Sequence, residues 1–128
     1  MEFNKSEFQL ISRHLVMPQH LNPNHHIFGG QLLAWLDKDI YIYVTNVLKY
    51  LMFVTVSMNN VYFKKPAYPG EILETYGKIK EVKRTSVTAF GKAAAFDPQT
   101  GSSRDIIECE LTYVSINEKG KPVRIIPV

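Results

Sequence analysis

Residues 22–49 read NPNHHIFGGQLLAWLDKDIYIYVTNVLK, a turn-rich segment that gives way to a long apolar one. Asn, Pro and Gly favour turns, so residues 22–30 predict a loop that ends at the pair Gly29-Gly30. After this pair, apolar residues recur at steps of three or four, as on one face of a helix: Leu33, Leu36, Ile40, Val44 and Val47. The pattern predicts a helix over residues 30–49.

This predicted helix is apolar on most of its sides. Leu32, Trp35, Tyr43 and Leu48 lie beside the stripe, and a helix of this kind is normally covered by other structure. Residues 41–45 read YIYVT, a run that by itself favours a strand, so the sequence leaves the last turns of the helix open.

The rest of the chain predicts strands joined by short turns. Runs rich in Val, Thr and aromatic residues occupy residues 53–62, 71–82, 86–96 and 104–116, and a shorter run at residues 13–17 precedes the loop. In the run at 104–116, apolar residues such as Cys109 and Tyr113 alternate with polar ones such as Glu108 and Glu110, so the sheet has one apolar face. A short tail over residues 123–128 follows.

The fold class predicted from these elements is α+β. One helix too apolar to be exposed and one sheet with a single apolar face combine most simply when the sheet curls around the helix. The 128 residues and 14.7 kDa fit one domain over residues 1–128. Such a shell leaves sheet edges free, so we expect a homodimer that completes the sheet.

Composition and charge narrow the possible partners. Hydrophobic residues make up 45% and charged residues 21% of the chain, which is typical of a globular protein and not of a disordered one. A net charge of +3 suits an anionic small ligand better than a nucleic acid. One Cys excludes an intrachain disulfide, and the His residues lack metal-ligand spacing, so we expect no metal.

The cellular setting follows from the same observations. The first residues contain acids and no apolar run that suits a secretory signal, and the sequence lacks an apolar run of about 18 residues for a membrane span. We therefore expect a cytoplasmic protein that binds neither membrane nor nucleic acid.

The pair Gly29-Gly30 is the first candidate for chemistry. Glycines at a helix start let a ligand approach the backbone, and the unpaired N–H groups of the first turn favour negative charge. An anion site or oxyanion hole is one interpretation. The other is a tight entry into a buried helix, with no ligand.

Asp37 is the second candidate, because a carboxylate inside an apolar helix is costly unless it meets a partner, a cleft or an interface. Lys38 and Asp39 follow it, so a polar helix face is the alternative. At 1.5 Å per residue, Asp37 lies about 10 Å along the axis from Gly30, too far for both to touch one atom. Helices of two subunits that meet antiparallel would bring the two together, which predicts a shared site.

Other reactive side chains have simpler interpretations. We expect His25 and His26 to lie on the loop surface, and Cys109 to pack in the core. The basic residues near strand ends and turns are expected to be mostly solvated, with a subset able to hold phosphates: Lys64, Lys65, Lys83, Arg84, Lys92 and Arg104.

A family resemblance joins these observations. Met17-Pro18, Asn22-Pro23-Asn24, Ile27-Phe28-Gly29-Gly30 and Leu36-Asp37 resemble, in order and spacing, the signature of hotdog-fold acyl-CoA thioesterases of the acyl-CoA hydrolase and YciA-like type. The similarity continues nearly to the end of the chain through these segments: Val54-Thr55-Val56, Lys65-Pro66-Ala67, Pro69-Gly70-Glu71, Thr85-Ser86-Val87 and Tyr113-Val114-Ser115.

The resemblance implies one long helix wrapped by a five- or six-stranded antiparallel sheet, and hydrolysis of acyl-CoA to a free acid and CoA. It implies no cofactor, since CoA is part of the substrate. Asp37 would activate water or attack the thioester, Asn22 of the partner subunit would orient water or carbonyl, and the Gly30 N–H would stabilise the oxyanion. Substrate contacts would come from Phe28, Gly29, Thr85 and Ser86. The homodimers would assemble further to a tetramer or hexamer, with a trimer of dimers favoured.

Two departures from the family pattern keep alternatives open. His25 stands where relatives usually have Gly, and Lys38-Asp39-Ile40-Tyr41 stands where small residues usually follow the Asp. Bulk there would change the acyl preference, or leave a non-catalytic acyl-CoA-binding or regulatory module. A hotdog dehydratase is the last alternative, because it would need a His on the helix, and residues 30–49 contain none.

Overall fold

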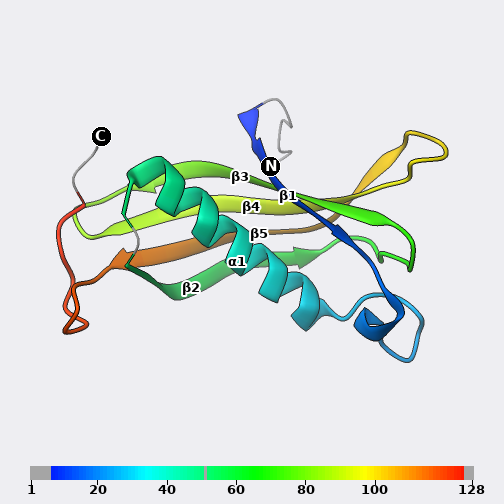
Figure 1. Ribbon diagram of the computed structural model, residues 1–128, viewed down its shortest axis with the longest axis horizontal. Helices are drawn as coiled ribbons and strands as arrows, with labels where there is room; N and C mark the ends of the chain where they lie inside the picture. Colours follow the sequence, from blue (N-terminus) through cyan, green and yellow to red (C-terminus); the bar gives the residue numbers. More distant parts are fainter. Residues whose placement is uncertain (1–6, 51, 126–128) are drawn as a thin grey trace.

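The computed structural model of the chain describes residues 7–50 and 52–125 and packs one long helix against an antiparallel sheet (Figure 1). Residues 1–6 and the last three residues of the tail predicted at 123–128 lie outside the described residues. The elements in chain order are β1 (Gln9–Leu15), the short 3-10 helix η2 (Pro18–His20), α1 (Gly29–Leu48), β2 (Phe53–Phe63), β3 (Ile72–Val82), β4 (Ser86–Phe96) and β5 (Ser103–Ser115).

The sheet has the strand order β1-β3-β4-β5-β2, and every neighbouring pair is antiparallel. The strands β3, β4 and β5 follow one another through short turns and form the centre. The strands that flank the helix in the sequence, β1 and β2, form the two edges. This arrangement is the hotdog fold expected from the sequence, with five strands in the described residues.

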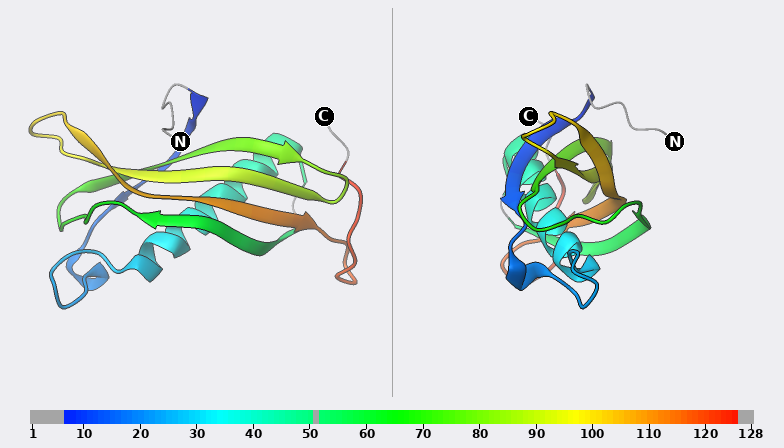
Figure 2. Two further views of the ribbon diagram at one scale, coloured as in Figure 1. Left: turned by 180° about the vertical axis from the view of Figure 1, so that it is seen from behind. Right: turned by 90° about the vertical axis from the view of Figure 1, so that its right-hand side faces the viewer.

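The helix α1 lies across the concave face of the sheet, which curves around it (Figure 2). Its buried apolar residues follow one another at steps of four and face the sheet: Leu32, Leu36, Ile40, Val44 and Leu48. The predicted stripe is wrong at Val47, which is 41% exposed. The run at 41–45 stays helical, because burial of residues such as Val44 outweighs local strand propensity.

Two glycines let the helix approach the sheet closely. Gly77 of β3 and Gly91 of β4 are register partners. A Cβ at Gly77 would lie 2.8 Å from Ile40 Cδ1, and a Cβ at Gly91 would lie 3.0 Å from Ile40 Cγ1. Side chains at these positions would therefore collide with Ile40, and the glycine pair fixes where α1 rests.

The first strand differs from its predicted position. It spans Gln9–Leu15 and not residues 13–17, because Gln9 and Leu10 pair with Gly77 and Tyr76 of β3. Residues 9–13 mix apolar and polar side chains without strict alternation, as an edge strand that exposes much of its surface can, so the sequence pattern did not reveal this pairing.

The outer face of the sheet holds a charged residue that the sequence did not lead us to expect. Lys92 was expected to be solvated but is only 4% exposed, with its Nζ 3.3 Å from Asp105 Oδ1 and 5.6 Å from the centre of the Phe8 ring. Strand β4 lies at the centre of the sheet, so its outward side chains are covered by their neighbours. No helix in the described residues is long and apolar enough to cross a membrane.

Candidate active site

The loop before α1 is organised by Asn22. Its Oδ1 accepts the N–H of Asn24 at 2.9 Å, its backbone N–H donates to the His26 carbonyl at 2.8 Å, and its Nδ2 donates to His26 Nδ1 at 3.3 Å. An Asn side chain that caps its own turn in this way holds the loop in one conformation. The His26 ring meets Tyr68 edge-on with 6.3 Å between the ring centres.

His25, one of the two departures from the expected family pattern, lies in an uncommon backbone conformation. Its φ is +63°, in the left-handed region, where glycine is the usual residue. The side chain is exposed, as expected. The loop therefore turns at His25 in a conformation that a glycine would adopt more easily.

The helix start presents two glycines with different surroundings. A Cβ at Gly29 would lie 3.0 Å from Cε1 of Phe63, so this glycine is needed for packing. A Cβ at Gly30 would meet nothing within 4 Å. Within the described part of the chain, the Gly30 N–H has no hydrogen-bond partner, as is usual in the first turn of a helix. The beginning of α1 thus offers an accessible backbone donor at Gly30, next to the half-exposed ring of Phe28.

A cleft of about 360 Å³ opens beside this helix start. Asn22 and Gly29 contribute to its wall, Leu32 and Phe63 supply apolar surface, and Lys65 is one of its charged residues. The cleft brings two of the predicted site residues together. Asp37 is not among its lining residues.

The segment that borders the cleft is held by Arg104. Its Nη2 donates to the Pro66 carbonyl at 2.8 Å and to Glu71 Oε1 at 2.6 Å. The guanidinium holds the pKa of the Glu71 carboxyl below its ordinary value. Arg104 was expected to be solvated, but its hydrogen bonds hold residues 66–71 in place. Within that segment, the Ala67 carbonyl accepts the N–H of Ile27 in the loop before α1.

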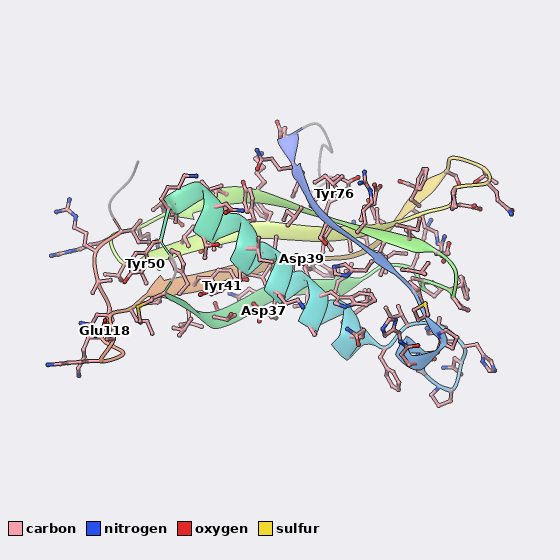
Figure 3. The ribbon with its side chains drawn as sticks, viewed as in Figure 1. Asp37, Asp39, Tyr41, Tyr50, Tyr76 and Glu118 are labelled. Atoms are coloured by element: carbon pink, nitrogen blue, oxygen red, sulfur yellow. The ribbon has the colours of Figure 1, made fainter. Side chains whose placement is uncertain are left out.

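Asp37 lies two turns further along α1, and its side chain turns toward β2 and β5 (Figure 3). Thr55 Oγ1 donates to Asp37 Oδ1 at 2.9 Å, and Tyr113 Oη lies 2.9 Å from the same oxygen and 2.9 Å from the Asp37 carbonyl. The carboxylate is partly buried and is held by hydroxyl groups, with no ion pair among the described residues. A carboxylate of this kind can accept a proton or attack a carbonyl carbon.

Thr55 and Tyr113 were not singled out as site residues from the sequence. The signal for Tyr113 was present, because the alternation in 104–116 turns it toward the helix. Its position next to Asp37 also depends on where the helix lies along the sheet. The alternation of apolar and polar residues gives no information about that position.

Thr85 lies in the turn between β3 and β4, and Ser86 is the first residue of β4, at the end of the sheet away from the cleft (Figure 1). The Thr85 carbonyl accepts the N–H of Ser115 at 2.9 Å. A second hollow of about 570 Å³ adjoins this turn and is lined by basic and apolar residues: Val82, Lys83, Arg84, Arg124 and Ile125. The exposed cations make this end of the molecule suited to an anion.

The four residues after Asp37 point in four different directions. Lys38 is exposed, Asp39 is 2% exposed and faces β1 and β3, and Ile40 rests on the glycine pair. Tyr41 packs edge-on against Phe53 and Tyr113, with 6.5 and 6.1 Å between ring centres. The bulk that departs from the family pattern is accommodated, and only Tyr41 places it beside the Asp37 site.

Comparison with known proteins agrees with this geometry. Residues 24–101 match the thioesterase superfamily. Over 129 residues the chain is 30% identical to the acyl-CoA thioester hydrolase YciA of Escherichia coli strain K12, an alignment that covers 98% of this chain and 96% of that protein. The hexameric hotdog fold thioesterase Cj0915 of Campylobacter jejuni has a TM-score of 0.82 and 31% identity, over 91% of this chain and 90% of that one.

A further solved relative is an acyl-CoA hydrolase from Staphylococcus aureus, in complex with butyryl coenzyme A, coenzyme A and coenzyme A disulfide. It has a TM-score of 0.84 and 27% identity, over 96% of this chain and 74% of that one. Its solved variants replace an aspartate or a threonine by alanine. The superfamily match over residues 24–101, together with the identity to YciA along almost the whole length, establishes that this chain belongs to the thioesterase superfamily.

Proposed function

We propose that the chain is an acyl-CoA thioester hydrolase that releases a free carboxylic acid and CoA. The observation that carries this proposal is the Asp37 carboxylate in the middle of α1, which Thr55 and Tyr113 hold against the sheet. The likeness to YciA and to the Staphylococcus aureus hydrolase supports the substrate class.

The reaction needs a base or nucleophile and a donor for the oxyanion. In one route, Asp37 takes a proton from water as the water oxygen attacks the thioester carbon, the C–S bond breaks, and the proton passes to the CoA sulfur. In the other, Asp37 attacks the carbon itself, CoA leaves, and water hydrolyses the resulting anhydride. The Gly30 N–H would stabilise the oxyanion in either route, a contribution of about 10² to 10³ in rate. Asn22 would orient the water or the carbonyl.

These groups are proposed to come from two chains of a homodimer. Within one chain Asn22 and Gly29 share a cleft that does not include Asp37. The outer strand β2 has a free edge and exposes apolar residues such as Val54 and Val56, which suits pairing with a second copy. The hexameric state of the Campylobacter jejuni relative supports further assembly, and among tetramers and hexamers we favour a trimer of dimers.

The CoA arm is proposed to contact Thr85 and Ser86. The hollow beside them contains Lys83, Arg84 and Arg124, and the phosphates of CoA are anions. Phe28 and Gly29 would contact the substrate at the other end, near the helix start. No cofactor is proposed beyond the CoA of the substrate.

The setting proposed for this activity is the cytoplasm. The chain has one cysteine, Cys109, and it is buried and unpaired. Free cysteines are usual in reducing compartments, where structural disulfides are rare.

The first test compares the wild type with Asp37→Asn in a thiol-release assay on acyl-CoAs from acetyl to long-chain and aryl. Asn keeps the size of the side chain and removes the carboxylate, so the rate should fall by about 10³ or more while the protein stays folded and assembled. If the folded variant hydrolyses at the wild-type rate, Asp37 has no such role. If the wild type binds acyl-CoA with saturation but releases no thiol, the chain is instead the non-catalytic acyl-CoA-binding module.

The shared site has its own test, which mixes two inactive variants, Asn22→Ala and Asp37→Asn. After the subunits exchange, a mixed dimer carries one site with both residues intact, so about a quarter of the wild-type activity should return. A site built within one chain would give no recovery.

A further inference from the structure

The two hydroxyl groups at Asp37 act on the same atom. Thr55 and Tyr113 both lie 2.9 Å from Oδ1, whereas Oδ2 has no hydrogen-bond partner among residues 7–50 and 52–125. The carboxylate is therefore held from one side only, and its second oxygen is free to meet water or a substrate.

The two donors come from adjacent strands and are register partners, since Thr55 of β2 pairs with Tyr113 of β5. Tyr113 is fully buried, at 0% exposed, and its ring packs against Tyr41. Thr55 is exposed. The buried ring cannot move without disturbing the core, so the position of its hydroxyl is set by the sheet.

The Tyr113 hydroxyl contacts the main chain of Asp37 as well as its side chain, since the Asp37 carbonyl oxygen is also 2.9 Å away. It thus ties both the carboxylate and the helix backbone at this residue to β5. Burial, and then the negative charge of Asp37, raise the pKa of Tyr113 well above its ordinary value. The phenol keeps its proton at any working pH and remains a donor.

We propose that Tyr113 is a positioning residue of the reaction: its hydroxyl fixes Asp37 Oδ1 and so directs Oδ2 toward the reacting water or thioester carbon. This inference rests on the proposed function. Misplacing a reacting group by about 1 Å can cost on the order of 100-fold in rate, so an exact orientation of one carboxylate oxygen matters to the chemical step.

The test is Tyr113→Phe, which removes the hydroxyl and keeps the buried ring. With acyl-CoA substrates, kcat should fall by about 10- to 100-fold with KM within about twofold of the wild type, because binding is unchanged and the reacting group is misdirected. Tyr76→Phe is the matched control. Its hydroxyl is also on a buried ring of the same sheet, but it donates to Glu74 Oε1 at 3.1 Å on the outer face, so kcat should not change.

A second pair of variants probes the same oxygen from an exposed position. Thr55→Val removes the other donor and should lower kcat, and Thr55→Ser, which keeps a hydroxyl, should restore it. This pair tests whether hydrogen bonds to Oδ1 direct Asp37, and it does so even if Tyr113→Phe does not fold, because Thr55 lies outside the core.

The outcomes separate this inference from the proposed function. If the wild type releases thiol and folded Tyr113→Phe keeps its kcat, or loses no more than Tyr76→Phe, the positioning role is wrong and the proposed function stands. If Thr55→Val keeps the wild-type kcat, or if Thr55→Ser is as slow as Thr55→Val, hydrogen bonds to Asp37 Oδ1 do not control the rate, and the positioning role of the Tyr113 hydroxyl is overturned in the same way. If the wild type hydrolyses no thioester, both the proposed function and the positioning role of Tyr113 are wrong.

Discussion

The ring of Tyr41 stands beside the Asp37 site, one helical turn further along α1. It meets the ring of Tyr113, which in turn holds Asp37, and it meets Phe53, which packs edge-on against Tyr50 with 5.6 Å between ring centres. These aromatic residues fill the space between the second half of α1 and the start of β2. An acyl chain that extends from the thioester in this direction meets their rings.

Removing the ring is therefore expected to admit longer acyl groups. In Tyr41→Ala, the ratio of kcat/KM for decanoyl-CoA to that for butyryl-CoA should rise by about tenfold, since additional methylenes gain a place to bind. Tyr43→Ala is the control, because Tyr43 turns toward β3, where its hydroxyl accepts the N–H of Ile79 at 3.2 Å. An unchanged ratio in Tyr41→Ala would mean that the acyl chain leaves Asp37 in another direction.

At the scale of the element, two aspartates fasten α1 on opposite sides. Asp37 binds the hydroxyls of β2 and β5, and Asp39 faces the other edge of the sheet, where its Oδ2 lies 2.7 Å from His14 Nε2 of β1 and 2.8 Å from Thr75 Oγ1 of β3. The His14 ring is stacked on Trp35 with 4.4 Å between ring centres. The rotation of the helix, and with it the direction of Asp37, depends on both fastenings.

Asp39→Ala is expected to destabilise the fold by about 3 kcal/mol, because the partly buried His14 and the buried Thr75 lose the carboxylate to which they bind. Urea unfolding followed by circular dichroism measures this difference. Lys38→Ala, at the exposed neighbouring position, should change the free energy of unfolding by less than about 0.5 kcal/mol. An equally small effect of Asp39→Ala would contradict a fastening role.

The helix and the long strands could be predicted from the periodicity of apolar residues, because an element that packs one face on a core repeats apolar residues at its own helical or strand period. The two aspartates show what this periodicity cannot predict. Residues two apart on a helix point in roughly opposite directions, so Asp37 and Asp39 could not both belong to one polar face. Which partners each of the two meets depends on the strands packed beside the helix, whose positions relative to it no local sequence pattern records.

Some residues of the candidate site can be singled out from the sequence, and others cannot, because local patterns record only local features. Gly30, Asn22 and Asp37 stand out locally, as glycine at a helix start, an Asn in a turn and a charge in an apolar run. Thr55 acquires its contact only when β2 is placed next to β5 and beneath α1, so a Thr in a strand gave no sign of it.

At the scale of the whole molecule, the free edge of β2 is expected to join two copies. Val56→Lys places a charge among its exposed apolar residues, which should dissociate the dimer and lower the activity in proportion. Size-exclusion chromatography with light scattering measures the assembly. Leu10→Lys is the control at the opposite edge, on β1, and should leave the dimer intact. If Leu10→Lys dissociates the dimer and Val56→Lys does not, the copies pair through β1.

The burial of Cys109 has a consequence for an enzyme whose product is itself a thiol. Disulfide exchange requires a thiolate that solvent can reach. The Cys109 side chain is 2% exposed, and burial raises its pKa to about 12, so its sulfur stays protonated and out of contact at neutral pH. Because Cys109 is the single cysteine of the sequence, the folded protein offers no accessible thiol to which oxidised CoA could form a mixed disulfide, and oxidation of its product would leave the protein unmodified.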